Sequence, residues 1–314
     1  MNVIKITPRG YCHGVIDALN MAQEAAMDPS VPRPIHILGM IVHNEHITKA
    51  LVDLGVITVD DKSKTRMELL DTIKEGTVIF TAHGISPAVK EKAQAMGLNC
   101  IDASCRDVLT THRLIEDYAS QGYEILYIGK KGHPETEGAL GVAPGTVHLI
   151  QDLAGLEALK VGTDKLMITN QTTMSLWDVA KLARSIQEKY PTAAFIKEIC
   201  NATQIRQEAV ATKAKPAQLT LVVGDPYSNN SGRLAQVSEE LADVPAKRIA
   251  SLDELDLKWL DSIDTVAVTS GASTPTAITK EVISFLEQYD KKAPETWDTT
   301  SKVRPDQILF KRKH

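Results

Sequence analysis

Aromatic side chains are scarce in this chain: Phe, Trp and Tyr together make up 4% of its 314 residues. Proteins that bind single-stranded nucleic acid stack the bases on aromatic side chains that lie along a basic groove. Here the aromatic side chains are few, and the formal net charge of -5 leaves no basic excess. The composition therefore predicts that nucleic acid is not a partner.

Long apolar runs are absent as well. No stretch approaches the roughly 18 apolar residues of a membrane-spanning helix, and the opening MNVIKITPRG lacks the basic and apolar segments of a secretory signal. We therefore expect a cytoplasmic protein without a membrane partner, in a compartment that keeps thiols reduced. The chain also has no GxGxxG and no P-loop motif, so nothing indicates a dinucleotide or nucleoside triphosphate site.

Cysteine is the third scarce residue, with four in the chain and no CxxC pair to support a zinc ribbon or a thioredoxin-like motif. Three of them are regularly spaced, because Cys12, Cys105 and Cys200 lie 93 and 95 residues apart. Cys100 stands outside this series, and a buried packing role is the ordinary expectation for it. A spacing near one third of the chain indicates an internal triplication.

Two further positions repeat after each of these cysteines. An apolar run ends in a glycine 27, 24 and 24 residues later, and a polar residue follows four positions on: Gly39 with His43, Gly129 with His133, and Gly224 with Ser228. A second β-rich run then ends in polar residues: His83, Thr172 with Thr173, and Ser273. Any α/β chain alternates strands and loops at such intervals, but that alternation does not explain why a cysteine begins each unit.

Each unit has the pattern of alternating strands and helices. The runs VIKIT, IHILG, VIFTA and NCIDA are typical of short strands, and GVIDALNMAQEAA has the apolar period of a helix. Such alternation predicts small, mainly parallel sheets that bind ligands beyond the carboxyl ends of their strands. We therefore predict an α/β fold of three similar small domains in a pseudo-threefold arrangement. The predicted limits are 1–12 for the N-terminal strand and first cysteine turn, 13–104, 105–199 and 200–289 for the domains, and 290–314 for a C-terminal tail.

Three cysteines that meet at one centre can hold a metal. With a fourth ligand they bind zinc, whereas on a [4Fe–4S] cluster they leave one iron open, since such clusters usually take four cysteines. The residues alone leave both possibilities open. The polar residues of the repeat suit a phosphate or diphosphate, and Glu135, two residues after His133, is a candidate proton donor. Taken singly, each of these residues is more often structural.

Several motifs together resemble one family. PRGYCHGV, MIVHNEH, FTAHGIS, DASC, GHPETEG, NQTTMS, EICNATQIRQEAV, SNNSGRL and TSGAST occur in this order between residues 3 and 289. They resemble the 4-hydroxy-3-methylbut-2-enyl diphosphate reductase family, also called LytB or IspH, and come closest to its Bacillus-type branch.

The resemblance implies the last step of the methylerythritol phosphate (MEP/DOXP) route of isoprenoid biosynthesis. An iron–sulfur oxidoreductase there reductively removes the allylic hydroxyl of (E)-4-hydroxy-3-methylbut-2-enyl diphosphate. The products are isopentenyl diphosphate, dimethylallyl diphosphate and water, and the electrons arrive one at a time from ferredoxin or flavodoxin. We expect a monomer or a homodimer.

The resemblance also implies a role for each matched residue. Cys12, Cys105 and Cys200 would hold a central [4Fe–4S] cluster whose open iron binds the substrate hydroxyl. Glu135 would deliver protons, with Thr172 and His133 orienting the hydroxyl and the proton path. The substrate-binding residues would be His43, His83, His133, Thr172, Ser228, Asn229, Asn230 and Ser273.

The chain departs from the family pattern at a few places. Arg106 follows the second cysteine where many members have proline, and it is expected to point to solvent; Asn229 stands where some members have serine. Every expected ligand and the proton donor are still present.

Two alternative functions remain. One is a zinc hydrolase on the same cysteines with Glu135 as general base, and the other is an iron–sulfur sensor without catalysis. The presence of Glu135, Thr172 and the diphosphate residues disfavours the sensor.

Overall fold

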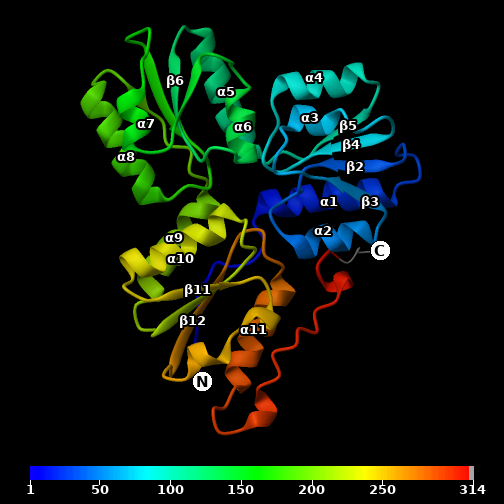
Figure 1. Ribbon diagram of the computed structural model, residues 1–314, viewed down its shortest axis with the longest axis vertical. Coiled ribbons are helices and arrows are strands. Elements are labelled where there is room, and N and C mark those ends of the chain that lie inside the picture. Colours follow the sequence, from blue (N-terminus) through cyan, green and yellow to red (C-terminus); the bar gives the residue numbers. More distant parts are fainter. Residues whose placement is uncertain (311–314) are drawn as a thin grey trace. The chain divides into compact units, whose positions relative to one another are not determined.

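The protein is built on three four-stranded sheets, which Figure 1 shows in a computed structural model that describes residues 1–310. Sheet I has the strand order β3 (Val56–Val59), β2 (Ile35–Leu38), β4 (Thr77–Phe80), β5 (Asn99–Asp102). Sheet II has the order β7 (Val147–Ile150), β6 (Glu124–Ile128), β8 (Leu166–Asn170), β9 (Ala194–Phe195). Sheet III has the order β11 (Ala246–Ile249), β10 (Leu219–Val223), β12 (Thr265–Ser270), β1 (Asn2–Lys5).

Strand order and direction are the same in the three sheets, and the strand pairs are parallel. In sheet III the fourth strand comes from the start of the chain, because β1 pairs with β12 and sets Asn2 opposite Thr265 and Lys5 opposite Val268. Each cysteine of the repeat therefore follows the fourth strand of a sheet. The predicted α/β fold with three similar parallel sheets is confirmed.

Helices connect the strands, as parallel pairing requires. They are α1 (His13–Met27), α2 (Glu45–Val52), α3 (Arg66–Leu70), α4 (Pro87–Ala95), α5 (Arg106–Ser120), α6 (Pro134–Leu140), α7 (Leu153–Ala158), α8 (Leu176–Lys189), α9 (Asn201–Lys213), α10 (Asn229–Leu241) and α11 (Thr276–Gln288). Short 3-10 turns occupy Leu252–Glu254, Leu257–Leu260, Pro294–Thr296 and Pro305–Gln307. Across residues 1–310, no helix combines the length and the apolar character needed to cross a bilayer.

Sheet II illustrates why these sequences form layers. One of its faces packs Leu126 and Ile168 against α8, and the other packs Ile125 and Met167 against α5 and α6. A parallel strand that is covered on both faces needs apolar residues at every position rather than at alternate ones. This requirement explains the apolar runs ILYI (residues 125–128) in β6 and LMI (residues 166–168) in β8.

The chain divides into two compact units. The first unit comprises residues 1–15, 43–53 and the chain from residue 201 onward, and it holds sheet III and α2. The second unit comprises residues 16–42 and 54–200, and it holds sheets I and II. The domain limits predicted from the repeat stay a prediction.

Within the first unit, the C-terminal segment returns to the first cysteine turn. The Tyr11 hydroxyl donates to the Ile308 carbonyl at 3.0 Å, and its ring meets that of Phe310 edge-on with centroids 5.8 Å apart. Trp297, by contrast, is 40% exposed and its indole N–H donates to the Asp290 carbonyl within the same tail. The last four residues of the predicted tail lie outside the described part of the chain.

Candidate active site

The three cysteine turns are built alike. The amide of Cys12 donates to the carbonyl of Ala272 at 3.1 Å, that of Cys105 to Ala82 at 3.0 Å, and that of Cys200 to Thr172 at 3.2 Å. Each acceptor is the second residue after the third strand of its sheet. Each cysteine is therefore held at the carboxyl edge of a parallel sheet, which is where such sheets bind ligands.

These bonds also decide which threonine of the Thr172–Thr173 pair matches the other two units. Thr172 is the equivalent of Ala82 and Ala272, so Thr173, not Thr172, occupies the position of His83 and Ser273. The hydrogen bond that closes each turn agrees with this register. The donating amides are those of Gly84, Met174 and Thr274, and the accepting carbonyls are those of Thr81, Gln171 and Gly271, respectively. Thr172 is thus a polar residue at a position where the other two turns have alanine.

Each cysteine of the repeat also stands at the start of a helix. Cys105 is the N-cap residue of α5, and Cys12 and Cys200 directly precede α1 and α9. The N-terminus of a helix carries partial positive charge, which favours a thiolate over a thiol. Within residues 1–310 no disulfide forms. The three cysteines of the repeat therefore share two features: each stands at the start of a helix, and none is in a disulfide.

Gly10 shapes the turn before the first cysteine. Its φ of +78° lies in the left-handed region that glycine enters without strain, and a Cβ there would lie 2.9 Å from the Thr276 hydroxyl oxygen. The Gly10 amide donates to Ser270 Oγ at 2.8 Å, and its carbonyl accepts from Nη2 of the buried Arg206 at 2.8 Å. The backbone two residues before Cys12 is thus fixed from two sides.

In the second unit, α6 presents Glu135 at its first turn. His133 is the N-cap residue of α6, and its Nδ1 accepts from the Glu135 amide at 3.2 Å. The Glu135 side chain is 2% exposed, and its Oε1 accepts from the Thr172 amide at 2.6 Å. The predicted proton donor therefore lies beside both residues that are expected to orient the substrate hydroxyl and the proton path.

Burial shifts the acidity of this carboxyl group. Desolvation raises the pKa of Glu135 to about 7, and the nearby Asp107 raises it further, while hydrogen bonds from Thr172 to the carboxylate oppose the shift. A pKa near neutrality leaves both the acid and the carboxylate populated at physiological pH. That is the condition under which a carboxyl group both gives and takes up protons efficiently.

His83 lies beside this group. Its ring meets that of His133 edge-on, with centroids 5.6 Å apart, and its Nδ1 lies 3.3 Å from Thr81 Oγ1. The buried Gln171 holds the loop that leads to His133, because its Oε1 accepts from the Lys130 amide at 3.0 Å. The second unit therefore brings together two histidines, the glutamate and Thr172.

In the first unit, three of the remaining predicted residues lie at the N-terminus of α10. Ser228 is its N-cap residue and accepts from the Ser231 amide at 3.3 Å, and Asn229 begins the helix. Asn230 is 6% exposed, and among the described residues no partner is found for its amide oxygen or nitrogen. Ser273 donates to the His43 carbonyl at 3.1 Å. A buried amide without a partner is costly and points to a polar ligand.

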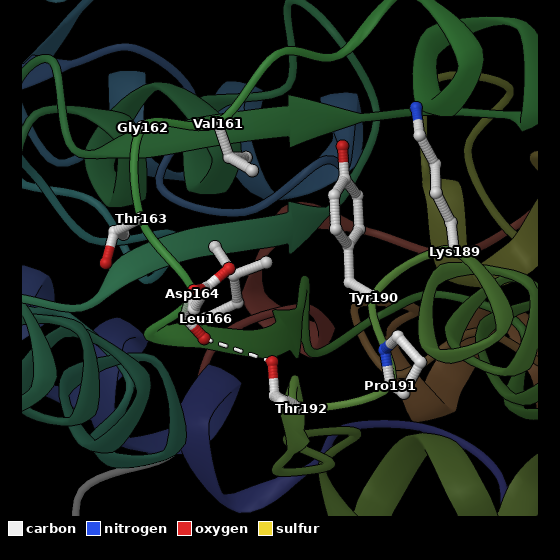
Figure 2. A pocket seen from close by; sticks show the side chains of 9 residues that line it. All are labelled: Val161, Gly162, Thr163, Asp164, Leu166, Lys189, Tyr190, Pro191 and Thr192. Atoms are coloured by element: carbon white, nitrogen blue, oxygen red, sulfur yellow. Dashed lines mark hydrogen bonds between the residues drawn. The ribbon is translucent and has the colours of Figure 1, made fainter.

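A pocket of about 410 Å³ in the second unit lies away from these residues (Figure 2). It is at the amino end of β8, beside Leu166, and its polar groups serve the packing: Lys189 donates to the Leu156 carbonyl at 2.6 Å and Thr192 to the Asp164 carbonyl at 3.1 Å. None of the predicted site residues lines it. This pocket is therefore separate from the cysteine turns, which lie at the carboxyl edges of the sheets.

Residues 3–287 match the family model described as LytB protein. The chain belongs to the LytB family. It is 59% identical to the 4-hydroxy-3-methylbut-2-enyl diphosphate reductase of Bacillus cytotoxicus over 98% of both chains, and equally identical to that of Bacillus mycoides over 98% of this chain and 97% of the relative. The resemblance to the LytB family and its Bacillus-type branch is thereby confirmed.

Solved structures of similar proteins agree. The structure of the E-1-hydroxy-2-methyl-but-2-enyl-4-diphosphate reductase from Plasmodium falciparum superposes with a TM-score of 0.84 at 32% identity, covering 91% of this chain and 87% of that one. A second structure, that of (E)-4-hydroxy-3-methyl-but-2-enyl diphosphate reductase, the terminal enzyme of the non-mevalonate pathway, gives a TM-score of 0.63 at 28% identity over 92% of this chain and 100% of that one. The LytB fold therefore extends over nearly the whole chain.

Some residues that shape this LytB site have no signal in the sequence. Three of them are buried polar residues whose side chains form hydrogen bonds with backbone groups far away in the chain: Gln171, Arg206 and Asp225. Gln171 lies in NQTTMS and Arg206 in EICNATQIRQEAV, so both stand inside quoted motifs without a repeated spacing to single them out. An alignment of homologues would have been the signal to look for.

Gly138 offers a test of the packing behind Glu135. A Cβ at this helical position would lie 3.2 Å from Cε1 of His112, whose ring also lies against Gly84. We expect Gly138→Ala to lower the free energy of unfolding by about 1 kcal/mol, because overpacking outweighs the better helix propensity. Gly155→Ala, where the nearest atom is Asp152 Oδ1 at 3.5 Å, should not destabilise the protein. Urea unfolding of both variants checks this; equal effects would contradict it.

Proposed function

We propose that this chain is a 4-hydroxy-3-methylbut-2-enyl diphosphate reductase that acts at the terminal step of the non-mevalonate route to isoprenoids. The observation that carries the proposal is its 59% identity, over 98% of its length, to Bacillus proteins of that name. The reaction takes up two electrons and two protons, breaks the C–O bond to the allylic hydroxyl, and releases water with isopentenyl or dimethylallyl diphosphate. The protein is then an oxidoreductase.

We infer that Cys12, Cys105 and Cys200 hold a [4Fe–4S] cluster. Thiolates are the ligands that such clusters take, and the donor set fits because each of the three thiols stands at a helix N-terminus outside any disulfide. Only three cysteines share the repeated turn, so one iron is left without a thiolate. When bound, the cluster supplies electrons one at a time and a Lewis-acidic iron.

Glu135 is the proton donor in this proposal. Hydroxide is a poor leaving group, so a proton delivered to the hydroxyl oxygen assists cleavage of the C–O bond. The 2% exposure of Glu135 keeps water from its carboxyl group, and its bond to the Thr172 amide fixes its direction. The Thr172 hydroxyl and His133 orient the substrate hydroxyl and the proton path.

The diphosphate is bound by His43, His83, Ser228, Asn229, Asn230 and Ser273, together with His133 and Thr172 near the hydroxyl. Ser228 and Asn230 support this assignment most directly, because they lie at the N-terminus of the 13-residue helix α10, whose partial positive charge attracts phosphate. Binding energy from the diphosphate is remote from the reacting carbon and can be used to hold the hydroxyl in place.

The physiological partners follow from the same proposal. A one-electron carrier, ferredoxin or flavodoxin, would supply the electrons. The protein works in the cytoplasm as a monomer or a homodimer. Its small-molecule partner is the allylic diphosphate, without nucleic acid or membrane.

Anaerobic purification followed by an electron-uptake assay tests the function. We expect brown protein with close to four irons and four sulfides per chain, and it should oxidise dithionite-reduced viologen when the hydroxylated diphosphate is added. Isopentenyl diphosphate, which lacks the hydroxyl, is the control and should leave the viologen reduced. A colourless protein with one zinc and no viologen oxidation would contradict the reductase and favour the zinc hydrolase.

A further inference from the structure

Asp225 is a buried carboxylate two residues after the end of β10 in the first unit. Its side chain is 3% exposed, so its charge must be balanced within the protein. Both oxygens accept hydrogen bonds from backbone amides: Oδ1 from Tyr227 at 2.8 Å and Oδ2 from Glu45 at 3.0 Å. The two donors are 182 residues apart in the chain, so this carboxylate joins two distant segments.

The first of these segments is the turn that leads into α10. Besides the bond from Tyr227, the Ser228 amide donates to the Asp225 carbonyl at 3.0 Å. Asp225 therefore fixes this turn through both its side chain and its backbone. Ser228 and Asn230, at the end of the turn, are two of the residues proposed to hold the diphosphate.

The second segment carries His43. Glu45 is the first residue of α2, and Asn44, its N-cap residue, separates it from His43. Ser273 donates to the His43 carbonyl at 3.1 Å, and Asp225 accepts from the Glu45 amide on the other side. The backbone that places His43 is thus held at two points, both on loops of sheet III.

The negative charge of Asp225, taken by itself, would oppose binding of the diphosphate. A carboxylate near a diphosphate repels it, and this repulsion is strong where water is excluded. Here, however, the carboxylate faces two backbone amides, one of them at the positively charged N-terminus of α2. Those bonds offset its charge and leave its main effect on geometry.

We propose that Asp225 is a positioning residue that ties the Ser228 turn to the His43 segment, so that the two halves of the diphosphate site keep a fixed separation before the substrate arrives. The proposal rests on the proposed function, and it adds a residue that makes no contact with the substrate itself. Preorganisation of this kind improves binding because less ordering remains to be done when the ligand binds.

Two variants of Asp225 and one control test the proposal. Asp225→Asn keeps one acceptor oxygen and places an N–H group against the other backbone amide. Asp225→Ser has a side chain too short to reach the Glu45 amide, and it replaces the first variant if that one folds poorly. Asp256→Asn is the matched control, because Asp256 also accepts from a backbone amide, that of Lys258 at 3.0 Å, on an exposed turn of the same unit. Calorimetry with inorganic pyrophosphate, steady-state kinetics and hydrogen exchange of the Glu45 amide are measured on each full-length holoenzyme.

We expect Asp225→Asn to weaken pyrophosphate binding and to raise the KM for the substrate, each about tenfold, with kcat within about twofold, as the loss of one charged hydrogen bond implies. The Glu45 amide should exchange faster, and the control should change none of these. Equal or tighter pyrophosphate binding in Asp225→Asn would overturn the proposal, because it would mean that the carboxylate acts by repulsion or not at all. A fall in kcat alone would overturn it too. If the unaltered protein binds no pyrophosphate and reduces no substrate, the proposed function fails instead.

Discussion

Replacing Cys105 by serine is expected to remove most of the iron and sulfide from anaerobically purified protein and to lower turnover by more than about 100-fold, since even a change outside the ligand shell costs 10- to 100-fold. A serine hydroxyl is not ionised at neutral pH and is a hard oxygen ligand, so it replaces a soft thiolate poorly. Serine is also a good N-cap residue, and Cys105 caps α5. The helix should therefore stay folded while the cluster is lost.

Cys100→Ser is the matched control for this experiment. Cys100 lies on β5, five residues before Cys105, and its thiol donates to the Leu98 carbonyl at 3.5 Å. Burial raises the pKa of this thiol. The nearby Lys90 lowers the pKa, Asp102 raises it, and the net shift is upward. It is therefore a thiol, not a thiolate, and iron content and turnover should be unchanged. Iron analysis and the viologen assay distinguish the two; loss of iron in Cys100→Ser instead of Cys105→Ser would reassign the ligand.

The features that could be predicted from the sequence are those set by neighbours in the chain. Parallel strands that are buried on both faces leave apolar runs, and a turn that holds a cysteine recurs wherever the same sheet recurs. This is why the spacing of Cys12, Cys105 and Cys200 indicated three equivalent sheets. The same spacing did not resolve whether Thr172 or Thr173 corresponds to His83 and Ser273, whereas the backbone hydrogen bonds place Thr172 with Ala82 and Ala272.

The features that could not be predicted depend on partners far away in the chain. Asp225 binds the Glu45 amide 180 residues away, and Arg206 binds the Gly10 carbonyl 196 residues away. Backbone amides and carbonyls are present in every residue, so no residue type at the distant end signals such a bond. The acidity of Glu135 likewise depends on burial that only the folded chain creates.

Glu135→Gln is the second change with a large expected effect. Glutamine keeps an oxygen that can accept from the Thr172 amide but has no proton to deliver, so we expect kcat to fall about 10²- to 10⁴-fold while iron content and KM stay close to those of the unaltered protein. Glu116→Gln, on an exposed part of α5, is the control and should be fully active. Turnover within about twofold of the unaltered protein would exclude Glu135 as the main proton donor, by the same catalytic scale.

The same substitution should change how stability depends on pH. The pKa of Glu135 in the folded protein, about 7, lies above its ordinary value of 4.5, so between these values the folded state holds a proton that the unfolded chain has released. The stability contributed by this carboxyl group is therefore fully present below the lower pKa and is lost as the pH rises through the higher pKa.

A glutamine at this position does not titrate, so it has no such pH dependence. Relative to the unaltered protein, Glu135→Gln should gain up to about 3 kcal/mol in unfolding free energy between pH 4.5 and pH 8. Urea unfolding across this range measures the gain, and a difference that stays flat with pH would mean that the carboxyl is ionised at its ordinary pKa and is a poor proton donor at neutral pH.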